Sequence, residues 1–488
     1  MPYDPFLSLL AHATEALEAE FGSLPGFEPE PGAGAEAMAQ VLEETAHRLG
    51  DNYPYFHPLY AGQMLKPPHL VARAAYALAM KINPNNHALD GGRASSAMEV
   101  EAVREIAGMF GWKEYLGHLT SSGTFANLEA LWMAGQLRPG RRIVGSEQAH
   151  YTHHRISSVL KLEFKAVPAD ERGRMSLEAL ENELGKGDVG TVVATLGTTA
   201  MGAVDPLEEI LALAGRYGAR VHVDAAYGGY FGLIADALDE PARRAYAAIG
   251  AADSIVIDPH KHGLQPYGCG CVLFKDPAVG RFYKHDSPYT YFTSKQLHLH
   301  PSEQKSLAGG PVHLGEISLE CSRAGAAAVA LWTTQRLLPL TKDGAFAEGL
   351  RRGRRAALEL DRRLRKDERF VTLGASLPTS QNRDVGHPPD PGHPPELDIV
   401  VWAVRAADLR KASEQAQMVF DACARRGLHL ALVQLPGSWF GACNRAQNEP
   451  GALTCLRSVL MKPEHEAWMG EIWERLSAAC DEGLGIRD

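Results

Sequence analysis

The stretch that decides the fold is Ser254-Ile255-Val256-Ile257-Asp258-Pro259-His260-Lys261-His262-Gly263. Its leading run, Ser254 followed by three apolar residues, predicts a buried strand, and Lys261 follows where that strand ends. A second run, Val-His-Val-Asp-Ala-Ala-Tyr at 221–227, predicts another strand that ends near Asp224. Ligands of open parallel sheets bind at the carboxyl ends of the strands. The sequence therefore predicts a site that contains both Lys261 and Asp224.

A lysine and an acid in this arrangement are the groups that pyridoxal 5'-phosphate (PLP) chemistry needs. The lysine amine forms a Schiff base with the cofactor, and the carboxylate keeps the pyridine nitrogen protonated, so that the ring accepts electrons. Either residue alone is common in proteins, and a single buried aspartate is more often structural. The hypothesis therefore depends on finding further motifs beside this pair.

One such motif is the segment 119–131, which predicts a loop that opens into a helix. Ser122, Gly123 and Thr124 stand at the predicted start of the helix, where small residues leave backbone N–H groups and the positive end of the helix dipole free for a phosphate. Serine-rich helix starts also occur on ordinary helices. Placed ahead of the acid strand and the lysine strand, this one predicts a phosphate cup.

Two further segments fit the same site. His150 follows a strand-like run at 142–145, and a histidine at a strand exit can lie flat over a cofactor ring; the alternative is a capping or surface histidine. The apolar run 191–199 predicts a buried strand whose tip carries Thr199, which can reach the phenolic oxygen of the ring. The alternative for this tip is an ordinary turn.

With these motifs in this order over about residues 50–340, the chain resembles the group II PLP-dependent amino-acid decarboxylases. That family includes aromatic amino-acid, tyrosine, glutamate and cysteine-sulfinate decarboxylases. The resemblance implies an α/β protein of PLP-dependent transferase fold type I, the aspartate-aminotransferase-like fold. It implies that Lys261 forms the Schiff base and that Asp224 pairs with the pyridine nitrogen. It further implies Ala226 below the ring, His150 above it, Thr199 beside it, and Ser122, Gly123, Thr124 and His260 around the phosphate.

The substrate is open between two classes. The continuation of the lysine motif to Pro266-Tyr267 and the phrase Ser322-Arg323-Ala324-Gly325 resemble bacterial tyrosine decarboxylases. The aromatic-rich segment 53–60 resembles the one that borders the pocket in relatives, which also favours an aromatic amino acid. Arg93 stands where relatives often have a small residue or proline. Its guanidinium favours glutamate or aspartate instead, because it can pair with a side-chain carboxylate.

Other activities of a PLP site are weighed by the residues they need. An aminotransferase holds the substrate carboxylate in plane with an arginine, for which Arg405 and Arg410 are candidates, although solvated charges are the simpler interpretation. A carbon–carbon lyase acting on a phosphorylated amine needs a second basic anion pocket, which the sequence does not suggest. A PLP-binding scaffold without turnover has no need for the set Lys261, Asp224 and His150. Decarboxylation is therefore the favoured reaction.

The segment from about 281 to 310 is rich in Tyr, His, Ser and Gly and has little periodicity, which predicts a functional loop. In relatives, a mobile loop in this region covers the site of the neighbouring subunit and supplies an aromatic hydroxyl that donates a proton. Tyr289 and Tyr291 are the candidates for that donor. The alternative is that both are surface tyrosines.

Three segments organise the chain. Residues 1–85 predict a helical arm and dimerisation segment, 86–345 a PLP-binding large domain, and 346–488 a small C-terminal α/β domain. In the large domain strands and helices alternate, which predicts right-handed crossovers and a mostly parallel sheet. The first 50 residues predict two helices that cannot bury their apolar faces alone, and the resemblance implies that this arm wraps around a partner in a homodimer.

The sequence predicts both ends of one helix in the large domain. Asp205 and Pro206 predict its N-cap and first residue, and Gly218 predicts its stop.

Composition limits the remaining possibilities. With 488 residues, 45% of them hydrophobic, the chain predicts a large globular enzyme. The net charge of −10, without a long basic run, argues against nucleic acid and anionic membranes as partners. Seven scattered cysteines fit a reducing cytoplasm, and Cys269-Gly270-Cys271 is a poor spacing for a metal or a disulfide, so no metal is expected. No run reaches membrane-spanning length and no leader pattern opens the chain, so we expect a cytoplasmic protein.

Overall fold

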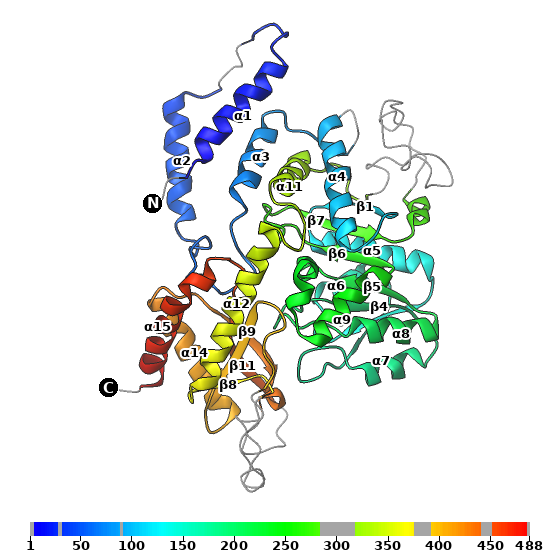
Figure 1. The fold of residues 1–488 in the computed structure, drawn as a ribbon, viewed down its shortest axis with the longest axis vertical. Coiled ribbons are helices and arrows are strands. Elements are labelled where there is room, and N and C mark those ends of the chain that lie inside the picture. Colours follow the sequence, from blue (N-terminus) through cyan, green and yellow to red (C-terminus); the bar gives the residue numbers. More distant parts are fainter. Residues whose placement is uncertain are drawn as a thin grey trace.

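Figure 1 shows the computed structural model of the chain. It describes residues 4–27, 32–87, 91–283, 318–374, 392–440 and 451–485.

A seven-stranded sheet forms the centre of the large domain. Its strands lie side by side in the order β1 (Leu116–Thr120), β7 (Gly270–Phe274), β6 (Ser254–Ile257), β5 (Arg220–Asp224), β4 (Val189–Thr195), β2 (Arg142–Ser146) and β3 (Phe164–Val167). Every pair from β6 to β3 is parallel, whereas β7 is antiparallel to both of its neighbours. The predicted mostly parallel sheet is confirmed.

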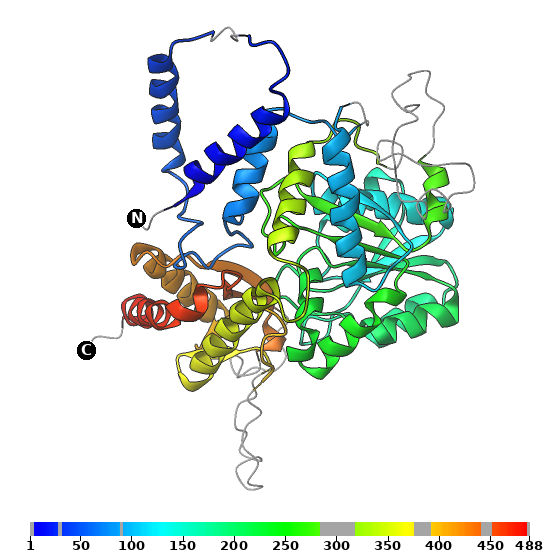
Figure 2. The same ribbon diagram turned by 45° about the horizontal axis from the view of Figure 1, so that its top comes forward.

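Helices cover both faces of this sheet, which explains why its central strands are apolar throughout. Every residue of β4 and β6 is buried, as expected for strands that meet protein on both faces. The covering helices are α5 (Gly123–Leu137), α6 (Thr152–Val159), α7 (Leu177–Leu184), α8 (Leu207–Tyr217) and α9 (Glu240–Ala248), and Figure 2 shows them around the strands. Short 3-10 turns at Gly229–Ala237, Ile249–Ala251 and Pro277–Phe282 complete the domain.

The start of α8 differs from the prediction. Asp205 does not cap this helix: its buried carboxylate accepts the backbone N–H groups of Met175 and Thr195, each at 2.7 Å. Pro206 is the residue before the helix rather than its first residue. Gly218 ends α8 in the left-handed conformation (φ 70°), as predicted. Asp205 therefore joins β4 to the loop before α7, a contact that local sequence does not specify.

A four-stranded antiparallel sheet forms the second domain, in the order β10 (Ala431–Pro436), β11 (Ala452–Val459), β9 (Ile399–Val404) and β8 (Phe370–Thr372). The helices α12 (Ala345–Lys366), α14 (Leu409–Arg425) and α15 (His465–Leu484) pack with it, and a 3-10 turn spans Gly437–Trp439. The segment before α3 joins this domain, because Ala61 donates to the His429 carbonyl and accepts from the Val459 N–H, both within 2.9 Å. Each sheet lies within one predicted range, and we propose the division at 86 and 346 on that ground.

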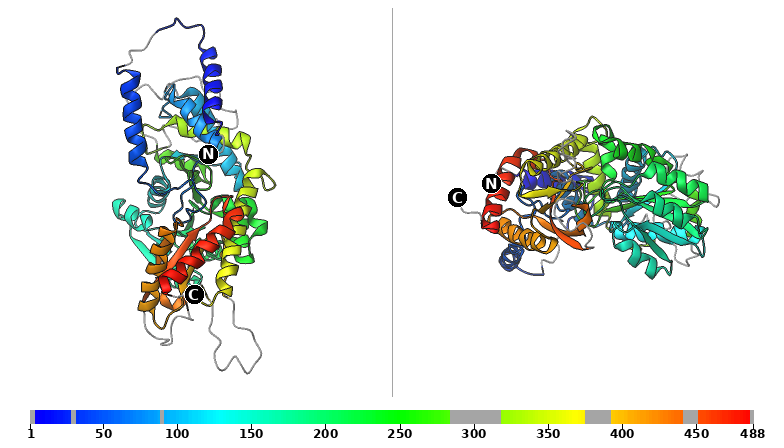
Figure 3. Two further views of the ribbon diagram at one scale, coloured as in Figure 1. Left: turned by 90° about the vertical axis from the view of Figure 1, so that its left-hand side faces the viewer. Right: turned by 90° about the horizontal axis from the view of Figure 1, so that it is seen from below.

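The N-terminal arm consists of α1 (Phe6–Glu20) and α2 (Ala35–Leu49), two helices as predicted. α1 lies against α3 (Leu70–Met80), which packs with α4 (Arg93–Met109) on α11 (Gly325–Leu337). α2 stands apart from the rest of the chain in Figures 1 and 3. Neither arm helix has a buried residue, and the arm exposes a set of large apolar side chains: Leu7, Leu9, Phe21, Leu24, Phe27, Met38, Val41, Leu42 and Leu49. Such a surface is typical of an interface.

In the part of the chain that the structure describes, no helix combines the length and the apolar character needed to span a membrane.

Candidate active site

A cavity of about 210 Å³ lies at the carboxyl ends of β4, β5 and β6. Every residue that the sequence predicts to bind the cofactor lines it: Ser122, Gly123, Thr124, His150, Thr199, Asp224, Ala226, His260 and Lys261. The structure adds six lining residues: Asn127, Thr152, Thr195, Gly197, Tyr227 and Asp258. Tyr289 and Tyr291 lie outside the described residues. Parallel pairing brings these motifs, spread over about 140 residues of sequence, to one edge of the sheet.

The phosphate cup is the start of α5. The Ser122 side chain caps the helix by accepting the N–H of Phe125 at 3.2 Å. The first N–H groups of a helix have no partner within it, so those of Gly123 and Thr124 remain for an anion. A side chain at position 123 would overlap the Asp258 carboxylate, so only glycine allows the cup to lie this close to the lysine loop.

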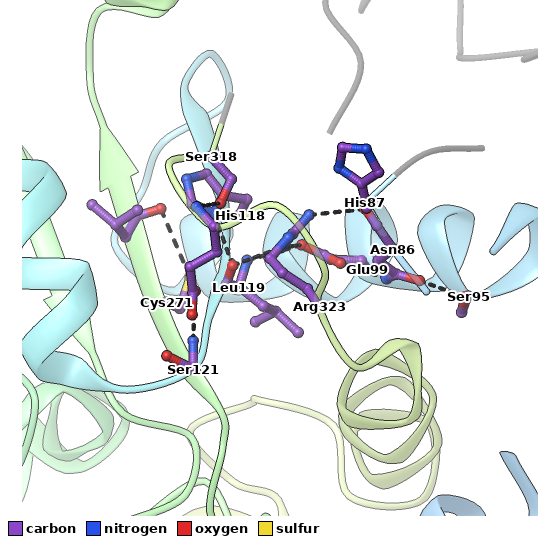
Figure 4. Close-up of polar contacts among 12 residues, drawn as sticks. Asn86, His87, Ser95, Glu99, His118, Leu119, Ser121, Cys271, Ser318 and Arg323 are labelled. Atoms are coloured by element: carbon purple, nitrogen blue, oxygen red, sulfur yellow. Dashed lines mark hydrogen bonds and ion pairs between the residues drawn. The ribbon is translucent and has the colours of Figure 1, made fainter. Parts of the chain in front are cut away.

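A buried ion pair lies beside the strand that leads to the cup (Figure 4). The Arg323 guanidinium donates to the Glu99 carboxylate at 2.6 Å and to the Leu119 carbonyl at 2.7 Å. Glu99 also accepts the Leu119 N–H at 3.0 Å, and the Glu320 carboxylate accepts the Ser121 N–H at 2.8 Å. The N–H and the carbonyl of Leu119 are therefore both fixed, three residues before Ser122 of the cup. This gives the Ser322-Arg323 phrase a structural role beside the site.

The two segments on either side of residues 284–317 are held together by one carboxylate of α5. The fully buried Glu129 carboxylate accepts from the Tyr283 hydroxyl at 2.8 Å and from the Leu319 N–H at 3.1 Å. His118 lies 2.9 Å from the same carboxylate. Tyr283 and Leu319 therefore lie close to each other beside α5.

Lys261 lies among charged neighbours at the end of β6. Its Nζ is 3.0 Å from Oδ2 of Asp258, and His260 Nε2 is 3.5 Å from the same oxygen. His260 donates from Nδ1 to the Cys269 carbonyl at 2.8 Å, and burial lowers its pKa. The second carboxylate oxygen of Asp258 is buried without a hydrogen-bond partner in the described chain, as is the Thr195 hydroxyl that also lines the cavity.

Asp224 lies at the end of β5 with three N–H donors. Oδ2 accepts from His153 Nε2 at 2.7 Å and from the Asn127 amide at 3.3 Å, and Oδ1 accepts the Ala226 N–H at 3.1 Å. Burial alone would raise its pKa, but the His153 hydrogen bond and the electrostatic effects of His153 and Lys261 outweigh burial and hold the pKa well below its ordinary value. Asp224 is therefore an anion that lines the cavity.

His150 is half-buried and held by Thr152. The Thr152 hydroxyl is 2.8 Å from His150 Nδ1, and its backbone N–H points to the same nitrogen at 3.4 Å. Burial lowers the pKa of His150, and although Asp224 raises it, the charge of Lys261 lowers it further. A neutral imidazole that accepts at Nδ1 carries its proton on Nε2.

Three arginines singled out from the sequence do not line the cavity. Arg405 donates to the Glu368 and Phe370 carbonyls, Arg410 pairs with Glu414 four residues on, and Arg93 is exposed at the first residue of α4. Arg457 of β11 is the arginine that reaches the cavity wall, donating to the Thr199 carbonyl at 2.7 Å. The sequence carries no local signal for Arg457, because its partner lies in the other domain.

The residues present fit PLP. A primary amine, an ionised carboxylate and a helix start with free N–H groups converge on one cavity, with a neutral imidazole at its wall. Among the residues that the structure describes, no cluster of three or more His, Cys, Asp or Glu side chains is arranged to hold a metal ion.

Comparisons with known proteins bear on the family and the fold of the chain. The model of the pyridoxal-dependent decarboxylase conserved domain matches residues 135–375. L-tyrosine decarboxylase of Enterococcus faecium is 26% identical over 80% of this chain and 76% of that protein. A probable L-tyrosine/L-aspartate decarboxylase of Methanothrix thermoacetophila is 30% identical over 62% of this chain and 71% of that protein. The crystal structure of Oryza sativa TDC with PLP and tryptamine shares the fold, with a TM-score of 0.73 at 18% identity over 99% of both chains.

Proposed function

Because this chain belongs to the pyridoxal-dependent decarboxylase family, we propose that it converts an aromatic L-amino acid to the corresponding amine and CO₂. PLP is the cofactor, and the architecture is fold type I, as the sequence resemblance to the group II decarboxylases implies. One observation carries the proposal for the site: Lys261, the anionic Asp224 and the cup at Ser122–Thr124 line the same cavity.

Bound PLP supplies an electron-accepting ring that stabilises the negative charge left on the α-carbon when one of its bonds breaks. In our assignment Lys261 is the covalent attachment point and the carboxylate of Asp224 faces the ring nitrogen. The N–H groups of the cup neutralise the phosphate. His150 would cover one face of the bound ring and Ala226 the other, and together they would exclude water; both line the cavity.

The chain's residues favour loss of CO₂ over amino transfer. Which bond of the substrate would break depends on where the chain's residues hold the substrate carboxylate. A carboxylate placed against a neutral His150, away from water, is destabilised relative to neutral CO₂. An aminotransferase would hold the substrate carboxylate with an arginine, and neither Arg405 nor Arg410 lines the cavity. Arg457 reaches the cavity wall, but its guanidinium donates to the carbonyls of Thr199, Ala200 and Gly62.

An aromatic substrate is supported by the names of the tyrosine decarboxylase relatives, and the second candidate, an acidic substrate, by the M. thermoacetophila name. A panel of L-amino acids, with CO₂ and amine measured for each, tests the choice. We expect tyrosine, DOPA or tryptophan to react with the highest kcat/KM. Arg93→Ala is expected to leave those rates within about twofold, because Arg93 is exposed and does not line the cavity.

Two other results would contradict this assignment. Turnover of glutamate or aspartate alone, lost in Arg93→Ala, would replace the aromatic assignment with the acidic one and leave decarboxylation standing. A keto acid formed without CO₂ would remove decarboxylation itself.

We also propose that the protein is a cytoplasmic homodimer in which the arm covers the partner. The apolar side chains that α1 and α2 expose support the dimer, and the absence of disulfides among the described cysteines supports the location. Removal of residues 1–50 is expected to yield a monomer with at least tenfold lower activity, measured by light scattering and amine formation. The full-length chain is expected to be a symmetric dimer. A full-length monomer with normal activity would refute this arrangement.

A further inference from the structure

Two neighbouring histidines near the start of α6 have opposite environments. His153 is fully buried, and its Nε2 lies 2.7 Å from Oδ2 of Asp224. His154 is exposed, and its ring lies 6.2 Å from that of Phe164. Successive residues of a helix point about 100° apart, which explains why only one of them reaches the cofactor site.

A second chain of donors reaches the same oxygen of Asp224. The Ser254 hydroxyl is 2.8 Å from His222 Nδ1, His222 Nε2 is 2.9 Å from the Asn127 amide oxygen, and the Asn127 amide nitrogen is 3.3 Å from Asp224 Oδ2. Burial lowers the pKa of His222 to about 3, so His222 is neutral and carries one proton. Because the Asn127 oxygen only accepts, that proton is on Nε2, and every group in the chain donates toward Asp224.

The other nitrogen of His153 has no competing contact. Nδ1 is buried and has no hydrogen-bond partner within the described chain. A carboxylate oxygen only accepts, so the 2.7 Å contact with Asp224 needs a proton on Nε2 of His153. Within the described chain, this hydrogen bond is therefore the one that holds the His153 ring against the carboxylate.

We propose that His153 is a positioning residue of the cofactor site: as an N–H donor it fixes the orientation of the anionic Asp224, so that this carboxylate binds the protonated ring nitrogen of PLP. Asn127, His222 and Ser254 fix the same oxygen from the other side. The inference rests on the proposed role of Asp224 and extends it to groups that do not contact the cofactor.

The test measures PLP binding to apoenzyme with no amino acid present. Two ligands are titrated: PLP, and an analogue in which CH replaces the ring nitrogen. His153→Leu, which removes the donor, is expected to bind PLP about tenfold or more weakly and the analogue with unchanged affinity. His153→Gln keeps a neutral N–H donor and is expected to stay within about threefold of the wild type. His154→Leu is the matched control and is expected to bind both ligands normally.

Each other outcome overturns the proposal. Equal losses for both ligands in His153→Leu would mean that His153 only supports the fold, and unchanged PLP affinity would mean that it does not act on Asp224. A folded His153→Gln that binds like His153→Leu would mean that an N–H donor at this position is not what orients Asp224. If His153→Leu does not fold, His153→Asn, whose shorter amide does not reach Asp224, replaces it. Failure of the proposed substrate would appear only in the amino-acid panel and would leave these affinities unchanged.

Discussion

Replacement of Lys261 by alanine is expected to abolish amine formation and to remove the yellow absorbance of the purified protein. Lys261 is the lysine whose Nζ lies in the cavity, 3.0 Å from Asp258. Without it the cofactor has no covalent attachment, and the substrate has no preformed imine to exchange with. We expect a fall in kcat/KM on the order of ten-thousandfold or more, about 5 kcal/mol of transition-state stabilisation. Absorbance spectra and CO₂ release measure the two effects.

Lys275 provides the matched control for this variant. It follows β7, is exposed, and donates to the Gly250 carbonyl at 3.0 Å, away from the cavity. Lys275→Ala is therefore expected to keep both the absorbance and the activity. Should Lys261→Ala retain the spectrum of the wild-type enzyme, another residue would have to be the attachment point and the lysine assignment would be wrong.

Asp224→Asn is expected to bind PLP and to lose activity on the order of a thousandfold, about 4 kcal/mol. Asparagine has nearly the shape of aspartate, so the fold is retained. Its neutral amide, however, does not stabilise a protonated ring nitrogen, and an unprotonated ring accepts electrons poorly. The measurement is kcat at saturating substrate in PLP-loaded enzyme, because the effect is on the chemical step rather than on substrate binding.

Asp276→Asn is the control for the change of charge. Asp276 is exposed and caps the turn at Pro277–Phe282 by accepting the Ala278 N–H at 2.9 Å, a role that asparagine also fills. Its activity is expected to match the wild type. Ordinary turnover in Asp224→Asn would show that the carboxylate charge is not needed and would end the assignment of Asp224 to the ring nitrogen.

The strands and the principal site residues were predictable because their signals are local. A continuous apolar run at 254–257 predicts a strand buried on both faces, and β6 is that strand. Lys261 and Asp224 lie at the carboxyl ends of such runs, and in a parallel sheet the carboxyl ends of neighbouring strands share one edge. The two helices of the arm were likewise predictable from the local sequence pattern.

The buried hydrogen bonds that orient the site residues were not predictable, because each of them joins residues that are distant in sequence. His153 and Asn127 lie on helices, and only the packing of α6 and α5 on the sheet decides that they face Asp224. Asp205 reads locally as a helix cap, yet the fold buries it and gives it the N–H groups of Met175 and Thr195.

The arginine at the cavity wall shows the same division. Arg405 and Arg410 were candidates by their position after a strand, but they bond to their own surroundings, and Arg457 reaches the wall from β11 of the other domain. Residue type and local periodicity thus determined the elements and the chemical groups of this protein. Only the tertiary structure decided which buried polar groups orient them, because a buried hydrogen bond is satisfied by whichever partner the packing brings within reach.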